Sequence, residues 1–247
     1  MNLEDLKRQI NQVMHEHNYQ GIPDFEGYSP SEMHQILHFT FDAKSPVQLQ
    51  TLSDSDYQLY KETDSLTVHL SRILLELSGF TKKRNGKLSL TKSGEKTVFD
   101  QEKCLKTIFK TFTTHFNWAY NDGYGDNEIG QLGYGFSLIL LSKYGKEKQL
   151  DSFYAEKYFK AYPQLLESMK KKDGILEDSH SKSCYSIRTF DRFLDYFGLI
   201  RIDKEGKGFD WVKYITKTDL FDRWIQCTPP ATLNRNFGGE YHSRRRP

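Results

Sequence analysis

Apolar residues repeat at helical spacing from Leu66 to Leu77, and the pattern stops before Gly79, a residue type that commonly ends helices. A basic stretch, Lys82–Lys87, follows and contains the pair Asn85-Gly86. Asn-Gly between two short strands is a strong local signal of a β-hairpin. Thr91 then stands where a further helix needs a capping residue. The pattern therefore predicts helix, hairpin and helix, with the basic stretch as the turn.

The same order of elements is predicted near the C-terminus. Apolar residues from Ile187 to Phe197 indicate a helix that ends at Gly198. A strand, a turn at 203–208 and a second strand follow, and Thr216 is expected to cap the next helix. The helix-ending glycines of the two stretches are 119 residues apart, and the expected capping threonines are 125 apart. The second hairpin should therefore be six residues longer than the first.

A helical middle, residues 99–172, separates these two stretches. Helices are expected over 99–120, 136–144 and 153–169, and Pro163 is expected to end or kink the last of them. Their apolar positions hold many phenylalanine and tyrosine side chains, because aromatic residues make up 14% of the chain. Aromatic rings should therefore fill much of the core.

The two ends of the chain differ in character. Residues 1–52 are predicted to form an N-terminal helical segment, with apolar stripes at helical spacing over 3–18 and 30–41. Residues 228–247 contain two adjacent prolines and three adjacent arginines. This composition is typical of a disordered basic tail.

Together these patterns predict a mainly α protein with small β-hairpins, of the α+β class. Two winged-helix-like units, at 53–98 and 173–227, are expected to flank the helical middle domain. The apolar pattern around 56–63, where the first unit needs a preceding helix, is weak. A repeat that keeps both the helix-ending glycine and the capping threonine nevertheless favours two related units.

Composition limits where the protein works. The 35 basic and 33 acidic residues give a net charge of +2, so attraction to a polyanion must come from local patches. The three cysteines have no CxxC spacing, which is typical of a reducing compartment. No apolar run approaches the length of a membrane span or of a signal peptide. The expected location is therefore the cytoplasm, with no membrane partner.

The stretch Leu70–Phe80, followed by the basic hairpin and Leu90–Gly94, resembles the end of MarR-type winged-helix regulators. The resemblance implies that the helix before the first strand is a DNA-recognition helix and that the hairpin is the wing. In the middle of the chain, Phe116–Gly123, Phe136–Leu138 and Phe153–Lys157 resemble blocks of an uncharacterised bacterial family, a likeness that implies no activity.

The first hairpin supplies the candidate nucleic-acid contacts. Basic residues in and beside such a wing contact phosphates, and a side chain off the apolar stripe of the recognition helix can reach a base. Exposed turns collect lysine for solubility as well, and Arg72 is placed to pair with Glu76 one helical turn later. The candidates are Arg72, Lys82, Lys83, Arg84, Lys87 and Lys92.

The second hairpin is a weaker candidate for DNA. Its basic residues, Lys204 and Lys207 among them, are interspersed with acidic ones. At the repeat offset of 119, Asp191 takes the place of Arg72, and DNA would repel it. This copy is therefore interpreted as structural or as facing a protein.

No catalytic residue, metal site or cofactor is predicted. His34 and His38 have the spacing of a helical metal pair but lack an evident third ligand. The acidic loop 121–128 departs from the calcium-loop pattern. His180 and Cys184 are four residues apart, with no third partner for a nucleophile.

Two functional hypotheses remain. In the first, the chain is a non-enzymatic DNA-binding or DNA-associated protein that uses the first winged-helix-like unit and its basic wing on double-stranded DNA. In the second, it is an interaction scaffold whose winged helices bind partner proteins. The basic first wing favours DNA, whereas the near-neutral total charge favours the scaffold.

Overall fold

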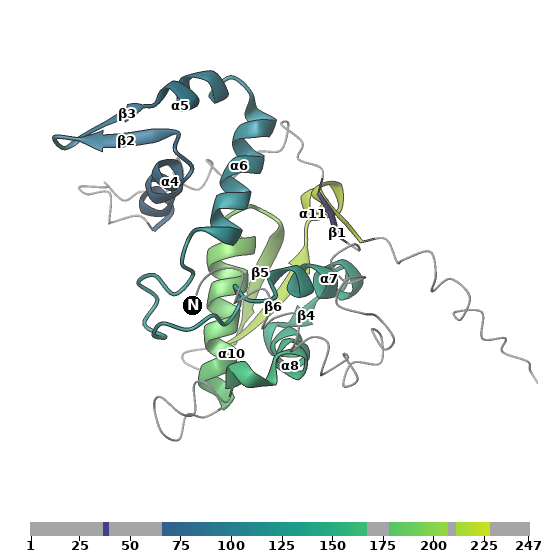
Figure 1. Cartoon of the computed structure of the whole chain (residues 1–247). Coiled ribbons are helices and arrows are strands. Elements are labelled where there is room, and N and C mark those ends of the chain that lie inside the picture. The colour runs from purple at the N-terminus through teal and green to yellow at the C-terminus, as the bar shows by residue number, and fades with distance from the viewer. Residues whose placement is uncertain (1–36, 40–65, 167–177, 207–210, 228–247) are drawn as a thin grey trace, which may run out of the picture.

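Helices and short antiparallel strands alternate along the chain in the computed structural model, which describes residues 37–39, 66–166, 178–206 and 211–227 (Figure 1). Helix accounts for 54% of this part and strand for 17%. The protein is therefore a mixed helix-and-strand protein. The weak segment at 56–63 and the tail at 228–247 lie outside the described residues.

The first helix, hairpin and helix form in the predicted order. They are α4 (Leu66–Leu77), β2 (Thr81–Arg84), β3 (Lys87–Leu90) and α5 (Lys92–Thr97). Asn85 and Gly86 both have positive φ, 48° and 77°, as a two-residue turn between twisted strands requires. Because this turn needs only two residues, the basic residues that were predicted to form it lie in the strands instead. The prediction of a six-residue turn was wrong.

The middle of the chain contains three main helices and one unexpected strand. They are α6 (Gln101–Thr114), α7 (Tyr134–Tyr144), β4 (Gln149–Leu150) and α8 (Asp151–Ala161). α8 ends two residues before Pro163, as expected from the helix-breaking effect of proline. β4 pairs with a strand of the C-terminal part, so the middle is not purely helical.

The C-terminal part repeats the order helix, hairpin, helix. It comprises α10 (Asp178–Ser186), the π-helix η3 (Ile187–Leu194), β5 (Ile200–Glu205), β6 (Val212–Lys217) and α11 (Asp219–Trp224). β6 lies between β4 and β5 in a three-stranded antiparallel sheet. The predicted cap was wrong, because Thr216 pairs with Arg201 inside the sheet and Thr218 caps α11.

The predicted helix over 30–41 is wrong at the residues that the structure describes there. Leu37–Phe39 form strand β1, which pairs with β7 (Ile225–Cys227) at the other end of the chain. A three-residue strand has little intrinsic preference of its own, so the distant partner decides its conformation. The remainder of the expected N-terminal helical segment, including His34, lies outside the described residues.

Both helices that precede a hairpin end in the same hydrogen-bond pattern. The Phe80 amide donates to the Leu75 carbonyl at 3.0 Å, and the Gly79 amide donates to the Glu76 carbonyl at 3.0 Å. These two bonds define a Schellman motif, in which a glycine with positive φ ends the helix. The C-terminal counterparts, each 119 residues later, are Leu199 to Leu194 at 2.9 Å and Gly198 to Asp195 at 2.8 Å.

Both hairpins are closed by a threonine that binds back to this glycine. The Thr91 hydroxyl donates to the Gly79 carbonyl at 2.6 Å, and the Thr218 hydroxyl donates to the Gly198 carbonyl at 2.8 Å. The same hydroxyls accept from the amides of Gly94 and Phe221 and so cap the following helices. These threonines are 127 residues apart, so the second hairpin is eight residues longer, not six.

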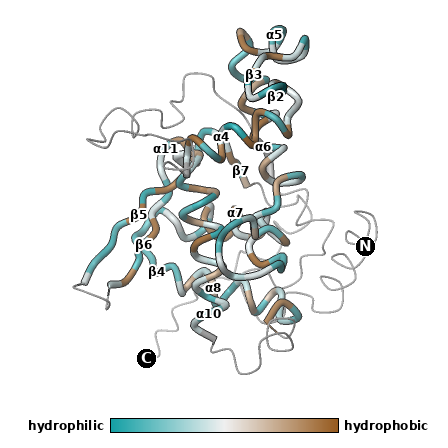
Figure 2. The backbone as a smooth tube through the Cα atoms, turned by 90° about the vertical axis from the view of Figure 1, so that its left-hand side faces the viewer, coloured by the Kyte–Doolittle hydropathy of each residue, from teal (hydrophilic) through white to brown (hydrophobic). Residues whose placement is uncertain are grey.

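One aromatic cluster lies at the centre of the described structure. Phe193 and Phe197 are fully buried and pack with Phe109, Phe112 and Trp118 at ring-centroid distances between 4.7 and 5.8 Å. The cluster thus joins the C-terminal half of α6 to η3. Figure 2 shows hydrophobic positions concentrated here, whereas the β5–β6 hairpin is mostly hydrophilic. Among the described helices, none combines the length and apolar character needed to cross a bilayer.

Candidate nucleic-acid interface

The strand register divides the first hairpin into two unlike faces. Lys82 pairs with Ser89 and Arg84 pairs with Lys87, and side chains of directly paired residues share a face of the hairpin. Lys82, Arg84 and Lys87 therefore lie on one face, which we call the basic face. All three are exposed.

The opposite face of this hairpin is largely apolar. Thr81 pairs with Leu90 and Lys83 pairs with Leu88, so Lys83 lies among apolar side chains, away from the other three cations. Thr81 is buried, and a Cβ on Gly94 of α5 would lie 3.2 Å from Leu90 Cδ2. This face is therefore turned toward α5 at Thr81 and Leu90, whereas Lys83 and Leu88 nearer the turn remain exposed.

The cations of the first hairpin have no carboxylate partner in the part of the chain that the structure describes. Within the described residues, none of Lys82, Lys83, Arg84 and Lys87 takes part in an ion pair, and Lys92, the first residue of α5, has none either. Exposed cations without intramolecular partners are free to replace the counterions around a polyanion.

The acidic residues of the second hairpin form ion pairs, mainly with a lysine that precedes β4. On its outer face Lys148 pairs with both Glu205 and Asp203, and Arg201 also approaches Asp203, at 3.6 Å. Lys204 lies over the Trp211 ring, 4.8 Å from its centroid. The two hairpins therefore share a connection pattern but differ in the charge that they present. Lys207 lies outside the described residues.

Asp191 lies in η3, 119 residues after Arg72. Its carboxylate pairs with the ammonium of Lys213, which is buried and also donates to the Ser186 hydroxyl at 2.9 Å. The Ser186 hydroxyl in turn donates to Asp151 at 2.6 Å. Asp191 thus links η3 to β6.

Helix α4, which the resemblance assigns to base recognition, is covered along most of its length. Every residue from Val68 to Glu76 is buried or half-buried. The Ser71 hydroxyl lies 2.8 Å from the Tyr196 hydroxyl, and His69 Nε2 lies 3.3 Å from the Tyr120 hydroxyl. Contacts with other parts of the molecule therefore occupy both sides of the helix.

Arg72 forms the intrahelical pair that its spacing indicates. Its guanidinium donates to the Glu76 carboxylate at 2.8 Å, and the Arg72 side chain is only 21% exposed. A base contact would require this pair to open. Of the six predicted nucleic-acid contacts, the structure thus brings three together on the basic face, and Arg72, Lys83 and Lys92 lie elsewhere.

A second set of lysines was missed in the sequence. Lys103, Lys106 and Lys110 are exposed on α6, and their spacing of three and four residues places them on one helical face. None of them has an ion-pair partner among the described residues. The helical spacing of these three lysines is visible in the sequence. It was overlooked because the apolar pattern of the same segment is stronger.

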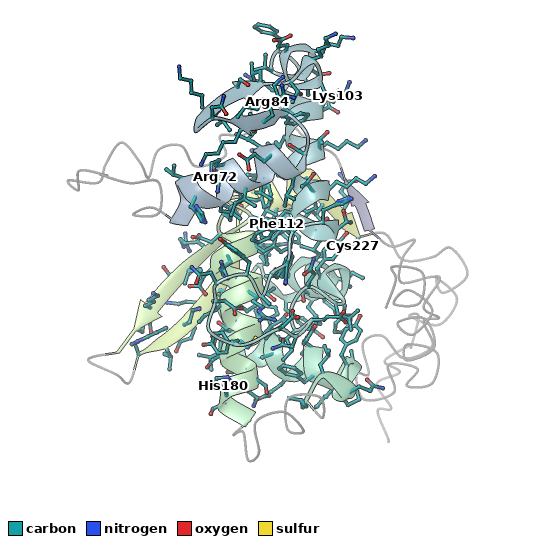
Figure 3. The ribbon with its side chains drawn as sticks, turned by 60° about the vertical axis from the view of Figure 1, so that its left-hand side comes forward. Arg72, Arg84, Lys103, Phe112, His180 and Cys227 are labelled. Atoms are coloured by element: carbon teal, nitrogen blue, oxygen red, sulfur yellow. The ribbon has the colours of Figure 1, made fainter. Side chains whose placement is uncertain are left out.

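Basic residues are therefore concentrated in one part of the molecule. Residues 82–110, called the basic segment below, hold nine basic and three acidic residues. Figure 3 shows Arg84 on the hairpin and Lys103 on α6 at the same end of the structure, far from His180. This end is the candidate nucleic-acid interface.

The acidic loop and Cys184, the other candidates for a chemical role, take part in the packing of the protein interior. Arg188 pairs with Asp122 and donates to the Asn127 and Gly125 carbonyls, so the acidic loop surrounds a guanidinium. Burial raises the pKa of the Cys184 thiol to about 12, which keeps it protonated and poorly nucleophilic. Within the described residues, no three His, Cys, Asp or Glu side chains are grouped to hold a metal ion.

Comparison of the chain with protein-family models, with curated proteins and with solved structures gives no match. No family or fold similarity therefore points to an enzymatic activity, and none identifies a winged-helix family.

Proposed function

We propose that the protein is a non-enzymatic DNA-associated protein that contacts the phosphates of double-stranded DNA through the basic face of its first hairpin. The observation that carries the proposal is the grouping of Lys82, Arg84 and Lys87 on one exposed face, where none of them pairs with an acidic residue that the structure describes. Cationic side chains held by a rigid hairpin position a protein on the sugar-phosphate backbone.

The matching hydrogen bonds at Gly79 and Gly198 support two related winged-helix-like units. In this interpretation the first hairpin is a DNA-contacting wing, and the second is a structural copy whose charges are neutralised. Helix α4 is buried or half-buried along most of its length, whereas a recognition helix needs a free face to enter the major groove. This favours binding to the DNA backbone over recognition of bases.

Fluorescence anisotropy with a labelled duplex at several salt concentrations tests this proposal. Each phosphate contact contributes about −0.9 to the slope of log affinity against log salt concentration. Replacing Lys82, Arg84 and Lys87 with alanine should therefore make the slope less negative by about 2 to 3 and weaken binding to all sequences alike.

Two matched controls sharpen this experiment. Lys83→Ala removes one charge from the other face of the same hairpin and should change the slope much less. Alanine at both Lys204 and Lys207 alters the second hairpin and should leave binding nearly unchanged. Absence of binding at low salt, or undiminished binding by the triple variant, would replace the DNA proposal with the scaffold.

A substitution at Arg72 distinguishes binding to the DNA backbone from recognition of bases. If Arg72 leaves Glu76 to contact a base edge, Arg72→Ala should reduce discrimination between sites by about 1–3 kcal/mol. Unchanged discrimination would assign the interaction to phosphates alone. The comparison needs only two duplexes of equal length and different sequence.

A protein-binding scaffold is the second candidate, and one observation favours it. Leu88 and Leu90 are 48% and 43% exposed on the apolar face of the first hairpin. Contiguous exposed apolar side chains mark surfaces that bind proteins when the patch is large, and these two leucines would form part of such a patch. Leu88→Ser combined with Leu90→Ser should leave DNA binding intact if the basic face is the functional one.

A further inference from the structure

Phe99 is the most exposed of the large hydrophobic residues that the structure describes. Its side chain is 92% accessible, whereas the neighbouring Val98 is 49% accessible. It lies between α5 and α6, at the end of the molecule that carries the basic segment (Figure 1). An aromatic ring in water is unfavourable, so a binding partner that covers it gains stability.

The backbone on both sides of Phe99 is fixed by hydrogen bonds. The Val98 amide donates to the Gly94 carbonyl at 2.9 Å, and the Asp100 amide donates to the Thr97 carbonyl at 2.9 Å. Asp100 also caps α6, because its side chain accepts from the Lys103 amide at 3.0 Å. The ring therefore projects from an ordered junction and not from a loose loop, and its exposure is set by the fold.

Cations stand on either side of this ring in the sequence. Lys96 lies in the last turn of α5 three residues before Phe99, and Lys103 lies in the first turn of α6 four residues after it. Both are exposed, and neither has an ion-pair partner among the described residues. The carboxylates of Glu95, Asp100 and Glu102 lie equally near in the sequence, so the positive charge at this end comes from the basic segment as a whole, which carries +6. A partner that covers the ring beside this segment combines a flat apolar surface with negative charge.

A nucleotide has that combination, because its base is a planar π-system and its phosphate is an anion. We propose that Phe99 stacks on an unpaired base next to the duplex that the basic face holds, with Lys96 and Lys103 beside the adjoining phosphates. The inference rests on the proposed function and extends it. It predicts that the protein prefers duplex ends carrying a single-stranded extension to plain duplex.

Anisotropy titration with two oligonucleotides isolates the stacking contribution. Both carry the same duplex and a short single-stranded extension, but in one of them the extension consists of abasic sites. The phosphates are then identical, and only the bases differ. The wild-type protein should bind the extension with bases about 5- to 150-fold more tightly, the range expected for stacking of one base on an aromatic ring.

Substitutions at the junction test the assignment to Phe99. Phe99→Ala should abolish the preference for bases while leaving affinity for blunt duplex unchanged. Phe99→Trp should retain the preference, since indole also stacks. Val98→Ala is the matched control, because it shortens a neighbouring exposed side chain and should leave the preference intact.

The outcomes separate this inference from the proposed function. Equal affinity for base-containing and abasic extensions, or a preference that survives in Phe99→Ala, overturns the stacking inference while binding to blunt duplex still supports the basic face. Failure to bind any of these oligonucleotides overturns both. Concentration-dependent self-association that Phe99→Ala removes, measured by light scattering in the absence of DNA, would assign the ring to a second copy of the chain and also overturn the inference.

Discussion

The guanidinium of Arg188 and the carboxylate of Asp122 form an ion pair from which solvent is completely excluded, since both side chains are 0% exposed. Arg188 also donates to the carbonyls of Gly125 at 2.9 Å and Asn127 at 2.8 Å. One arginine of the π-helix η3 thus organises the loop that joins α6 to α7.

Asp122→Asn should lower the free energy of unfolding by about 3–5 kcal/mol. The substitution keeps the volume of the side chain but leaves the buried Arg188 charge without its counterion. Urea titration followed by circular dichroism measures the loss. Glu156→Gln, which breaks the surface pair with Lys182, should cost less than about 1 kcal/mol. Equal effects of the two substitutions would show that the buried pair is not critical.

Phe193→Ala should destabilise the protein by about 3–5 kcal/mol. The Phe193 ring is fully buried and lies 4.7 Å from the Trp118 ring and 5.2 Å from the Phe112 ring, so its removal leaves a cavity between α6 and η3. Denaturant titration provides the value. A loss below about 1 kcal/mol would contradict the central position of this ring.

Thr91→Val and Thr218→Val should each cost about 1 kcal/mol of stability. Valine retains the shape of threonine but loses the hydroxyl that binds the helix-ending glycine and caps the next helix. Thr91→Ser and Thr218→Ser keep the hydroxyl and should retain most of the stability. Thermal unfolding of the four variants gives the comparison, and similar losses in both valine variants would support equivalent roles.

Gly133→Ala should be far more destabilising than Gly86→Ala. Both glycines have positive φ, 72° and 77°, so both alanines incur a backbone penalty of about 1–2 kcal/mol. At Gly133 a Cβ would also lie 2.4 Å from Cζ of the buried Tyr162 ring, whereas nothing lies within 4 Å at Gly86. Unfolding midpoints in urea separate the two contributions, and equal midpoints would show that Tyr162 moves freely.

Asp195→Asn should stabilise the protein at pH 7 but not at about pH 3.5. Burial, and secondarily the nearby Asp191, raise the pKa of the Asp195 carboxyl above its ordinary value. The folded state therefore favours the protonated form, and this contribution is lost as the pH rises through the folded-state pKa. Asparagine cannot ionise, so the stability difference should grow from acidic to neutral pH. A difference that stays constant with pH contradicts the shift.

Features that depend on neighbouring residues could be predicted from the sequence. The Asn85-Gly86 turn, the cap at Thr91 and the helix end at Gly198 follow from the backbone preferences of those residues. The choice between Thr216 and Thr218 could not be made in this way. It depends on how far β5 and β6 remain paired, which is a property of the sheet.

Long-range contacts account for most of the fold that was not predicted. β1 pairs with β7 near the opposite end of the chain, and β4 joins the sheet of the second hairpin. The pair Arg188–Asp122 spans 66 residues. Local propensity carries no information about such partners, because their conformations are decided by tertiary contacts.

The candidate site was predictable in composition but not in arrangement. The sequence identifies the cations of the first hairpin, but only the register shows that Lys83 faces away from Lys82 and Arg84. The residues that contact α4 from outside, Tyr120 and Tyr196, are distant in the sequence. The apolar pattern of the helix itself therefore could not predict these contacts.

Positive charge is concentrated in the basic segment, so the molecule has a positive end. Residues 82–110 carry a net charge of +6, although the whole chain carries only +2, so the remaining residues together carry −4. Such an uneven distribution is an electric dipole, and a dipole turns in the field of a polyanion before contact is made. The protein should consequently be retained on a cation exchanger at neutral pH more strongly than its net charge implies, with its hairpin end toward the matrix.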